Sequence, residues 1–403
     1  MKLPLQKLIP TAMAALALLL TSCSTQPVTE FGQRTDALDP AAWESSQWIS
    51  AADAPVVTGK IGDTENNRAA DGASWFVSTV KNEQKVVSAK WMTTGLGVYD
   101  IFVNGKLIGK EFMKPGYTHY SKTRLSFTYD ITDVIQTAAD AQNQFSAQVT
   151  PGWWGDKIIT PMGNEGFLGK KCAFRGVLEL TFADGTKKLY GTDLENWKAG
   201  IAGPVKHAAI FDGEIYDARE PMGYDCAEEF STPEENNEFA GDIFPSDGAE
   251  IYLRHDITLS PVEAYIWSGV EGAGDKEYGK VKITQKFTPG QEMVVRPGET
   301  LVIDFGQNAA AVPHFEFKGA EGTRLTCLPS ELLNDGNGAH SRGMDGPEGS
   351  VHRLNLRTPD SGMFLPQAMI TLHITHAIPS SDIAMSLLPL QEMSLSVLSV
   401  RSL

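Results

Sequence analysis

Apolar and polar residues alternate in short runs from Trp43 onward, and turn residues separate these runs. Residues 75–80, 86–94, 98–103 and 106–110 form the first runs of this kind. A period of two puts successive side chains on opposite faces of an extended strand. No stretch up to residue 230 sustains a 3.6-residue period except residues 130–137, where a short helix is expected with Asp130 as its N-cap. The pattern therefore predicts an all-β protein.

Two dipeptides that contain glycine mark expected hairpin turns. Asn104-Gly105 separates two of the predicted strands, and Asp184-Gly185 separates residues 177–182 from residues 186–191. A two-residue type I′ turn needs positive φ at both central positions, which these residue types tolerate. Both dipeptides are therefore predicted to close tight hairpins.

A loop-rich acidic passage from Cys226 to Asp247 divides the predicted strands into two blocks. The second block contains expected strands at 281–287, 292–296, 300–305 and 314–317. A chain of 403 residues is long enough to bury more than one core. We expect two consecutive β-sandwich domains of jelly-roll type, at residues 41–230 and 231–363.

The first residues have the pattern of an export signal. Lys2 and Lys7 precede an apolar stretch from Ala12 to Leu20, which is too short to span a bilayer. The following Leu20-Thr21-Ser22-Cys23 resembles the lipobox of bacterial lipoproteins. We therefore predict a signal peptide at 1–22, lipidation of Cys23, a polar tether at 23–40 and an extracytoplasmic, membrane-anchored protein. The alternative is an ordinary secretory signal that is cut nearby.

Charge and cysteine content narrow the partners and cofactors. The formal net charge is −16, and Lys and Arg form no run, so nucleic-acid binding is not expected. Cys172, Cys226 and Cys327 remain after Cys23, without the spacing of a zinc site or a disulfide framework, and are interpreted as buried free thiols. No cofactor is predicted from these patterns.

Several short motifs occur in the order found in one enzyme family. They are Gly95-Leu96-Gly97-Val98-Tyr99, Val103-Asn104-Gly105-Lys106, Pro115-Gly116-Tyr117-Thr118-His119-Tyr120, Gly152-Trp153-Trp154, Asp212-Gly213-Glu214-Ile215-Tyr216-Asp217-Ala218-Arg219 and Asp304-Phe305-Gly306-Gln307-Asn308. With these motifs the chain resembles the N-terminal modules of bacterial α-L-rhamnosidases, glycoside hydrolase family 78, over roughly residues 40 to 360. One departure is Ala311, where the family usually has Gly.

The resemblance implies a function for a longer protein. The family hydrolyses terminal α-L-rhamnosides with inversion, using two carboxylates on an (α/α)₆ barrel. No position of this chain matches that barrel, so we expect an N-terminal fragment that is inactive alone. Two alternatives stay open. The first is a lipid-anchored protein that binds rhamnose-containing glycans; calcium would be its ligand, because one module type of the family resembles calcium-dependent rhamnose-binding modules. The second is a structural or interaction lipoprotein.

Sugar contacts need aromatic faces and groups that pair with hydroxyls. The loop residues that offer them are Trp153, Trp154, Asp193, Glu214, Asp217 and Arg219. Packing in the core or between domains is the stronger interpretation for the two tryptophans. A structural ion-paired turn is the stronger interpretation for Glu214, Asp217 and Arg219. No catalytic residue is assigned.

The composition changes at the C-terminal end. From Phe364 to Leu403, Trp, Tyr and Gly are absent while Ser, Leu, Met and Ile become frequent, with no evident period. Back-translated and read in the adjacent frame, the tail yields PRYTFFGYRY, which resembles the segment that rhamnosidases carry at the end of this domain. We therefore predict a frameshifted tail at 364–403, an incomplete second sandwich, and poor packing after about Gly362. The alternative is a divergent C-terminus.

Overall fold

The computed structural model describes the chain in several stretches. These are residues 30–54, 56, 72–155, 168–210, 213–272, 277–288, 293–308, 311–319, 322–338 and 346–352, together with strands at 362–364, 370–373, 382–389 and 393–402. The predicted signal peptide and Cys23 lie outside these residues. Strands dominate the described part, which confirms the all-β prediction. Within it, no helix has both the length and the apolar character needed to cross a membrane.

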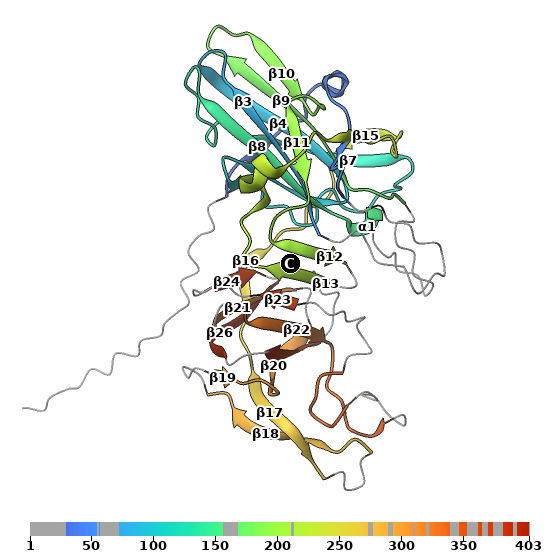
Figure 1. Ribbon diagram of the computed structural model, residues 1–403, viewed down its shortest axis with the longest axis vertical. Helices are drawn as coiled ribbons and strands as arrows, with labels where there is room; N and C mark the ends of the chain where they lie inside the picture. Colours follow the sequence, from blue (N-terminus) through green and yellow to red (C-terminus); the bar gives the residue numbers. More distant parts are fainter. Residues whose placement is uncertain are drawn as a thin grey trace, which may run out of the picture.

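The first domain is a sandwich of two sheets (Figure 1). The eight-stranded sheet has the order β1-β7-β4-β9-β2-β14, with β10 beside β9 and β15 beside β7. Its strands are β1 (Gln33–Arg34), β2 (Ile49–Ser50), β4 (Val86–Leu96), β7 (Thr123–Asp130), β9 (Ala173–Phe182), β10 (Lys187–Gly191), β14 (Glu234–Glu235) and β15 (Asp242–Pro245). The five-stranded sheet, in the order β11-β3-β8-β5-β6, consists of β3 (Ser74–Lys81), β5 (Val98–Val103), β6 (Lys106–Leu107), β8 (Gln142–Thr150) and β11 (Trp197–Gly200).

Aromatic rings fill the space between these two sheets. Trp91 of β4 meets Phe145 of β8 edge-on at 5.2 Å between ring centroids, and Phe174 of β9 lies 5.7 Å from Trp197 of β11. These contacts join side chains from opposite sheets, as expected when alternate residues of each strand face a shared interior. Three short helices complete the domain: η1 (Pro40–Ser45) and η2 (Gly223–Glu229), which are 3-10 helices, and α1 (Gly152–Gly155).

The second domain also contains two sheets, below the first domain in Figure 1. The larger has the order β12-β13-β23-β22-β25-β20-β17-β18, and the smaller has β16-β26-β21-β24 with β19 beside β26. The bounds are β12 (Val205–Ala209), β13 (Gly213–Asp217), β16 (Arg254–Leu259), β17 (Glu263–Glu271), β18 (Lys280–Lys286), β19 (Met293–Val295), β20 (Thr300–Asn308), β21 (Ala311–Gly319), β22 (Arg324–Ser330), β23 (Gly362–Phe364), β24 (Ile370–His373), β25 (Asp382–Pro389) and β26 (Met393–Ser402).

The strands cross the boundary expected at residue 230. The β12–β13 hairpin precedes it, yet β13 pairs with β23 of the second domain. β14 and β15 follow it, yet they pair with β2 and β7 of the first domain. Val205 and Ala208 of β12 also pack in one cluster with Trp75 and Phe102 of the first domain. The two domains therefore share structural elements around this boundary.

Local geometry corrects several sequence predictions. Asn104 and Gly105 have φ of 51° and 75°, which confirms the type I′ hairpin. At the β9–β10 turn only Gly185 has positive φ, and the Gly185 N–H donates to the Phe182 carbonyl, so this is a three-residue loop with a left-handed glycine instead.

The helix expected over residues 130–137 is a turn, because Asp130 accepts hydrogen bonds from the Thr132 amide and hydroxyl. Cys327 is half-buried, whereas Cys172 and Cys226 are buried as expected.

The tail contains paired strands. β25 pairs with β20 and β22 in the larger sheet, and β26 pairs with β16, β19 and β21 in the smaller one. Residues 393–397 read Met-Ser-Leu-Ser-Val, an alternation that suits a strand despite the change in composition. How the tail's side chains pack lies outside the described residues, and the frameshift stays a prediction.

Candidate functional site

The aromatic candidates lie at one end of the first domain, where α1 follows β8. Trp154 is buried and donates its indole N–H to the Lys171 carbonyl at 2.9 Å, so its ring belongs to the core. Trp153 is half-buried, and its ring meets Tyr117 edge-on at 6.2 Å. Tyr117 is 63% exposed. Trp153 and Tyr117 therefore form the accessible aromatic surface here, whereas Trp154 supports it from below.

A buried arginine underlies this surface. The Arg124 guanidinium lies 3.9 Å from the Tyr120 ring centroid, 4.6 Å from that of Trp154 and 4.7 Å from that of Phe239. It donates one hydrogen bond to the Thr123 carbonyl, while its Nε and one terminal nitrogen have no hydrogen-bond partner among the described residues. Burial lowers the Arg124 pKa to about 10. The rings thus hold a cation that carries few hydrogen bonds.

Asp193 lies elsewhere, in the turn between β10 and β11. Its carboxylate accepts hydrogen bonds from the Glu195 amide at 2.8 Å, the Asn196 amide at 2.6 Å and the Asn196 side chain at 2.8 Å. These bonds shape the turn locally. The structure therefore does not bring Asp193 together with the tryptophans of α1.

The third group of candidates lies on β13 and the turn after it. Arg219 donates to both carboxylate oxygens of Asp217, at 2.8 and 2.6 Å, and its backbone amide donates to the same carboxylate at 3.1 Å. The hydrogen bonds from Arg219 hold the Asp217 pKa below its usual range. This geometry is that of an ion-paired turn, which is the interpretation favoured from the sequence.

Glu214, on the same strand, is expected to make stability depend on pH. Burial raises its pKa from 4.5 to about 7, so the folded protein holds this proton more tightly than the unfolded chain does. The stabilisation is complete below about pH 4.5 and is lost as the pH rises through 7. Between pH 4.5 and 8 the unfolding free energy of the parent protein should fall by about 1–3 kcal/mol more than that of the Glu214→Gln variant. Urea titrations at both pH values measure this difference, and an equal fall in the two proteins would contradict it. The exposed Glu220, changed to Gln, is the control.

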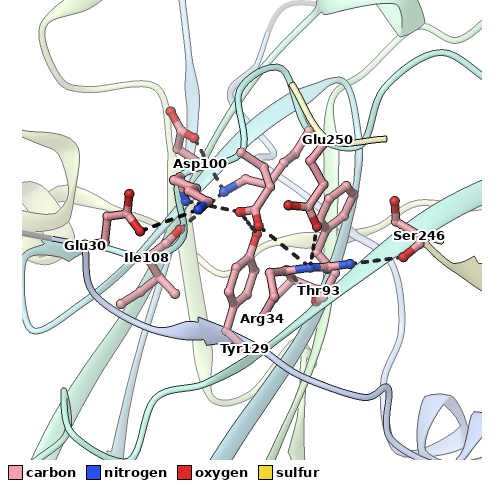
Figure 2. Close-up of polar contacts among 12 residues, drawn as sticks. Glu30, Arg34, Thr93, Asp100, Ile108, Tyr129, Ser246 and Glu250 are labelled. Atoms are coloured by element: carbon pink, nitrogen blue, oxygen red, sulfur yellow. Dashed lines mark hydrogen bonds and ion pairs between the residues drawn. The ribbon is translucent and has the colours of Figure 1, made fainter. Parts of the chain in front are cut away.

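A buried polar network that the sequence did not reveal joins three distant segments (Figure 2). Arg34 of β1 donates to the Ser246 carbonyl at 3.0 Å and to Glu250 at 3.2 Å, and its Nε lies 3.7 Å from a Glu111 carboxylate oxygen. Tyr129 donates to the other oxygen of Glu111 at 2.6 Å. The network therefore fastens the N-terminal strand and the segment leading to the second domain onto the first sandwich.

Lys114 lies in the same network and is almost fully buried. Its ammonium donates to the Ile108 carbonyl at 3.3 Å, lies 3.8 Å from the Asp100 carboxylate, and sits over the rings of Tyr99 and Tyr129. Desolvation lowers the Lys114 pKa. No sequence signal marks Lys114 or Glu111 as buried, because Lys and Glu are almost always exposed unless they are paired.

Comparisons with known proteins agree on one family. The α-L-rhamnosidase N-terminal domain matches residues 84–238, and the bacterial α-L-rhamnosidase concanavalin-like domain matches residues 276–362. The α-L-rhamnosidase of Streptomyces avermitilis is 28% identical over 275 residues, which cover 68% of this chain and 22% of that protein. The α-L-rhamnosidase of Alteromonas sp. is 27% identical over 301 residues, which cover 74% of this chain and 29% of that protein.

Solved structures show the same fold. An α-L-rhamnosidase from Dictyoglumus thermophilum superposes with a TM-score of 0.61 at 17% identity, covering 88% of this chain and 36% of that one. One from Aspergillus terreus superposes with a TM-score of 0.60 at 20% identity, covering 90% and 37%. The chain thus spans 22% to 29% of the two curated relatives' length.

Proposed function

Since this chain carries the N-terminal and concanavalin-like domains of the bacterial α-L-rhamnosidases, we propose that it is the non-catalytic β-sandwich portion of such an enzyme and hydrolyses no rhamnoside by itself. The two family matches support this assignment, because both fall on β domains that the curated relatives carry within much longer chains.

The arrangement of the described residues agrees with a non-catalytic role. Inverting glycosidases need an acid and a base about 6.5–9.5 Å apart on opposite sides of the glycosidic bond. Two of the candidate carboxylates are already engaged: Asp217 is paired with Arg219, and Asp193 accepts hydrogen bonds within its own turn. The helices in the described part are the short η1, α1 and η2, with no helical barrel among them.

We expect the purified chain to release no p-nitrophenol from p-nitrophenyl α-L-rhamnoside above the rate without protein. The physical reason is that sandwich domains without an acid–base pair cannot protonate the leaving group and activate water together. Absorbance of p-nitrophenolate measures the reaction, with a full-length α-L-rhamnosidase as the positive control. Release that increases with the concentration of this chain would overturn the proposal.

A further inference from the structure

The dipeptide Asn-Gly occurs twice in the sequence, at Asn104-Gly105 and at Asn337-Gly338. It carries a reaction of its own. Glycine has no Cβ, so its backbone nitrogen can approach the side-chain carbonyl carbon of the preceding asparagine without steric hindrance. Attack at that carbon closes a succinimide ring and expels the side-chain nitrogen. The asparagine must be able to turn its carboxamide toward the glycine, so the fold decides which of the two dipeptides reacts.

The fold holds Asn104 firmly against β8. Its backbone N–H donates to the Gln144 carbonyl at 2.9 Å, and its side-chain oxygen accepts a hydrogen bond from the Gln144 amide at 2.9 Å. Its side-chain nitrogen donates to Asn143 Oδ1, also at 2.9 Å. Both ends of the Asn104 carboxamide are thus bonded. Turning this side chain toward the Gly105 nitrogen would break both bonds and disturb the type I′ turn.

Asn337 has no such restraint on its side chain. In the part of the chain that the structure describes, its one hydrogen bond runs from the backbone N–H to the Asp335 carboxylate, at 3.0 Å. The residue is half-buried. Within the same part, the Gly338 N–H donates to no backbone carbonyl. Gly338 has a φ of +62°, and a Cβ at this position would collide with the Glu277 carboxylate. The Asn337 carboxamide can therefore rotate toward the Gly338 nitrogen without losing a hydrogen bond.

We propose that Asn337 is a site of spontaneous deamidation in the folded protein, whereas the fold protects Asn104. The Gly338 backbone nitrogen loses its proton to hydroxide and attacks Cγ of Asn337. The new N–Cγ bond replaces the Cγ–Nδ2 bond, and the side-chain nitrogen takes a proton from water and leaves as ammonia. A succinimide ring remains.

Water then opens this ring at either of its two C–N bonds and returns a proton to the Gly338 nitrogen. Opening at Cγ gives aspartate at position 337. Opening at the backbone carbonyl carbon gives isoaspartate, in which the main chain runs through the former side chain. The net reaction consumes one water and releases one ammonia, so no oxidant, reductant or enzyme is needed.

Either product adds a negative charge to a loop that already carries carboxylates. The Asp335 carboxylate accepts the Asn337 N–H, and the Glu277 carboxylate lies beside Gly338. The same loop is joined to the segment before β18 by a hydrogen bond from the Tyr278 N–H to the Gly336 carbonyl, at 3.0 Å. Like charges this close repel one another, and isoaspartate also lengthens the main chain. Deamidation is therefore expected to weaken the attachment of this loop.

Peptide mapping of the whole chain by mass spectrometry tests the proposal. One sample is incubated folded in mildly alkaline buffer and another in the same buffer with guanidinium chloride, and both are digested with trypsin over time. We expect Asn337 of the folded chain to deamidate at least about tenfold faster than Asn104, because Asn104 must first break two side-chain hydrogen bonds. In guanidinium chloride the two rates should be similar, since glycine follows both residues. Equal rates in the folded chain, or no conversion of Asn337 while the unfolded sample converts, would overturn the proposal.

The tryptic peptide 325–342 also contains Asn334, which serves as an internal comparison. The Asn334 side-chain nitrogen donates to Ser350 Oγ at 2.8 Å and to the Val351 carbonyl at 3.2 Å, and the residue after it is not glycine. Fragment ions separate the two asparagines, and the mass gain should appear at position 337 alone. In Asn337→Gln the gain should vanish, because the longer side chain has to close a larger ring. A gain that persists in this variant would place the reaction at another residue and overturn the assignment.

The pH dependence tests the chemical route. The attacking nitrogen must lose its proton, so the rate at Asn337 should rise from mildly acidic to mildly alkaline buffer. A rate that stays constant over this range would contradict attack by the Gly338 nitrogen.

Discussion

Replacing Glu111 with Ala is expected to lower the unfolding free energy of the first domain by about 2–3 kcal/mol, because the change leaves the buried Tyr129 hydroxyl without its acceptor and removes one of the two carboxylates beside Arg34. Glu111 accepts hydrogen bonds from the Tyr129 hydroxyl and the Lys110 amide, and it lies 3.7 Å from the Arg34 guanidinium. Its side chain is 2% exposed, so water cannot replace these interactions. Lys114, also buried, would lose a favourable charge interaction as well.

The matched control is Glu250→Ala. Glu250 binds the same arginine, at 3.2 Å, but its side chain is 29% exposed. Partly exposed ion pairs contribute about 0–1 kcal/mol, so this variant should unfold close to the parent protein. Urea unfolding followed by tryptophan fluorescence suits the comparison, because the fluorescence reports mainly on the first domain. Trp267 is the one tryptophan of the sequence that lies outside it. If Glu111→Ala were no less stable than Glu250→Ala, the network would not carry the stability assigned to it.

The contacts of this network could not be predicted from the sequence alone. Arg34 and Ser246 are 212 residues apart, and nothing local to either residue indicates that they meet. Periodicity reports which face of a strand is buried, but a charged residue in a loop, such as Glu111, carries no such period. Burial of Glu111 and Lys114 depends on β1 and the segment after β15 covering them, which is a property of the tertiary fold.

Local sequence patterns predicted the structure correctly where turn residues or the alternation of apolar residues determine it. Asn104-Gly105 folds as its residue types require, and β3, β4 and β5 follow the predicted runs closely. The tail shows the opposite case: the change in composition after residue 363 suggests the end of the fold, although Met393 to Val397 alternate as a strand does. Composition indicates what a segment is made of, whereas the period of its apolar residues indicates how it pairs.

The candidate site residues were only partly predictable, for a similar reason. Motifs placed Trp153, Asp193 and Glu214 in loops or at strand ends, but the three belong to separate parts of the structure. A residue type with the right chemistry is a necessary feature of a site, and convergence of several such residues requires the fold.

Gly97→Ala is expected to destabilise the first domain by about 3 kcal/mol or more. Gly97 joins β4 of the larger sheet directly to β5 of the smaller one, so the chain changes sheets within a single residue. Its φ is +130°, a backbone conformation that residues with a Cβ rarely adopt. A Cβ added there would lie 2.2 Å from the Thr150 carbonyl oxygen and 2.8 Å from a Val149 methyl carbon. Because a backbone atom blocks the position, no rotation of a neighbouring side chain relieves the clash.

Gly185→Ala is the control at a left-handed glycine without a clash. Gly185 also has positive φ, +85°, but a Cβ added there would meet no atom within 4 Å. Its substitution should cost about 1 kcal/mol, the typical penalty for placing alanine in the left-handed region. Urea midpoints from tryptophan fluorescence compare the two variants under identical conditions. Equal midpoints for Gly97→Ala and Gly185→Ala would show that β4 and β5 can shift to make room. A much lower midpoint for Gly97→Ala shows that the φ of +130° and the contact with Thr150 together explain why the Gly-Leu-Gly-Val-Tyr motif needs its second glycine.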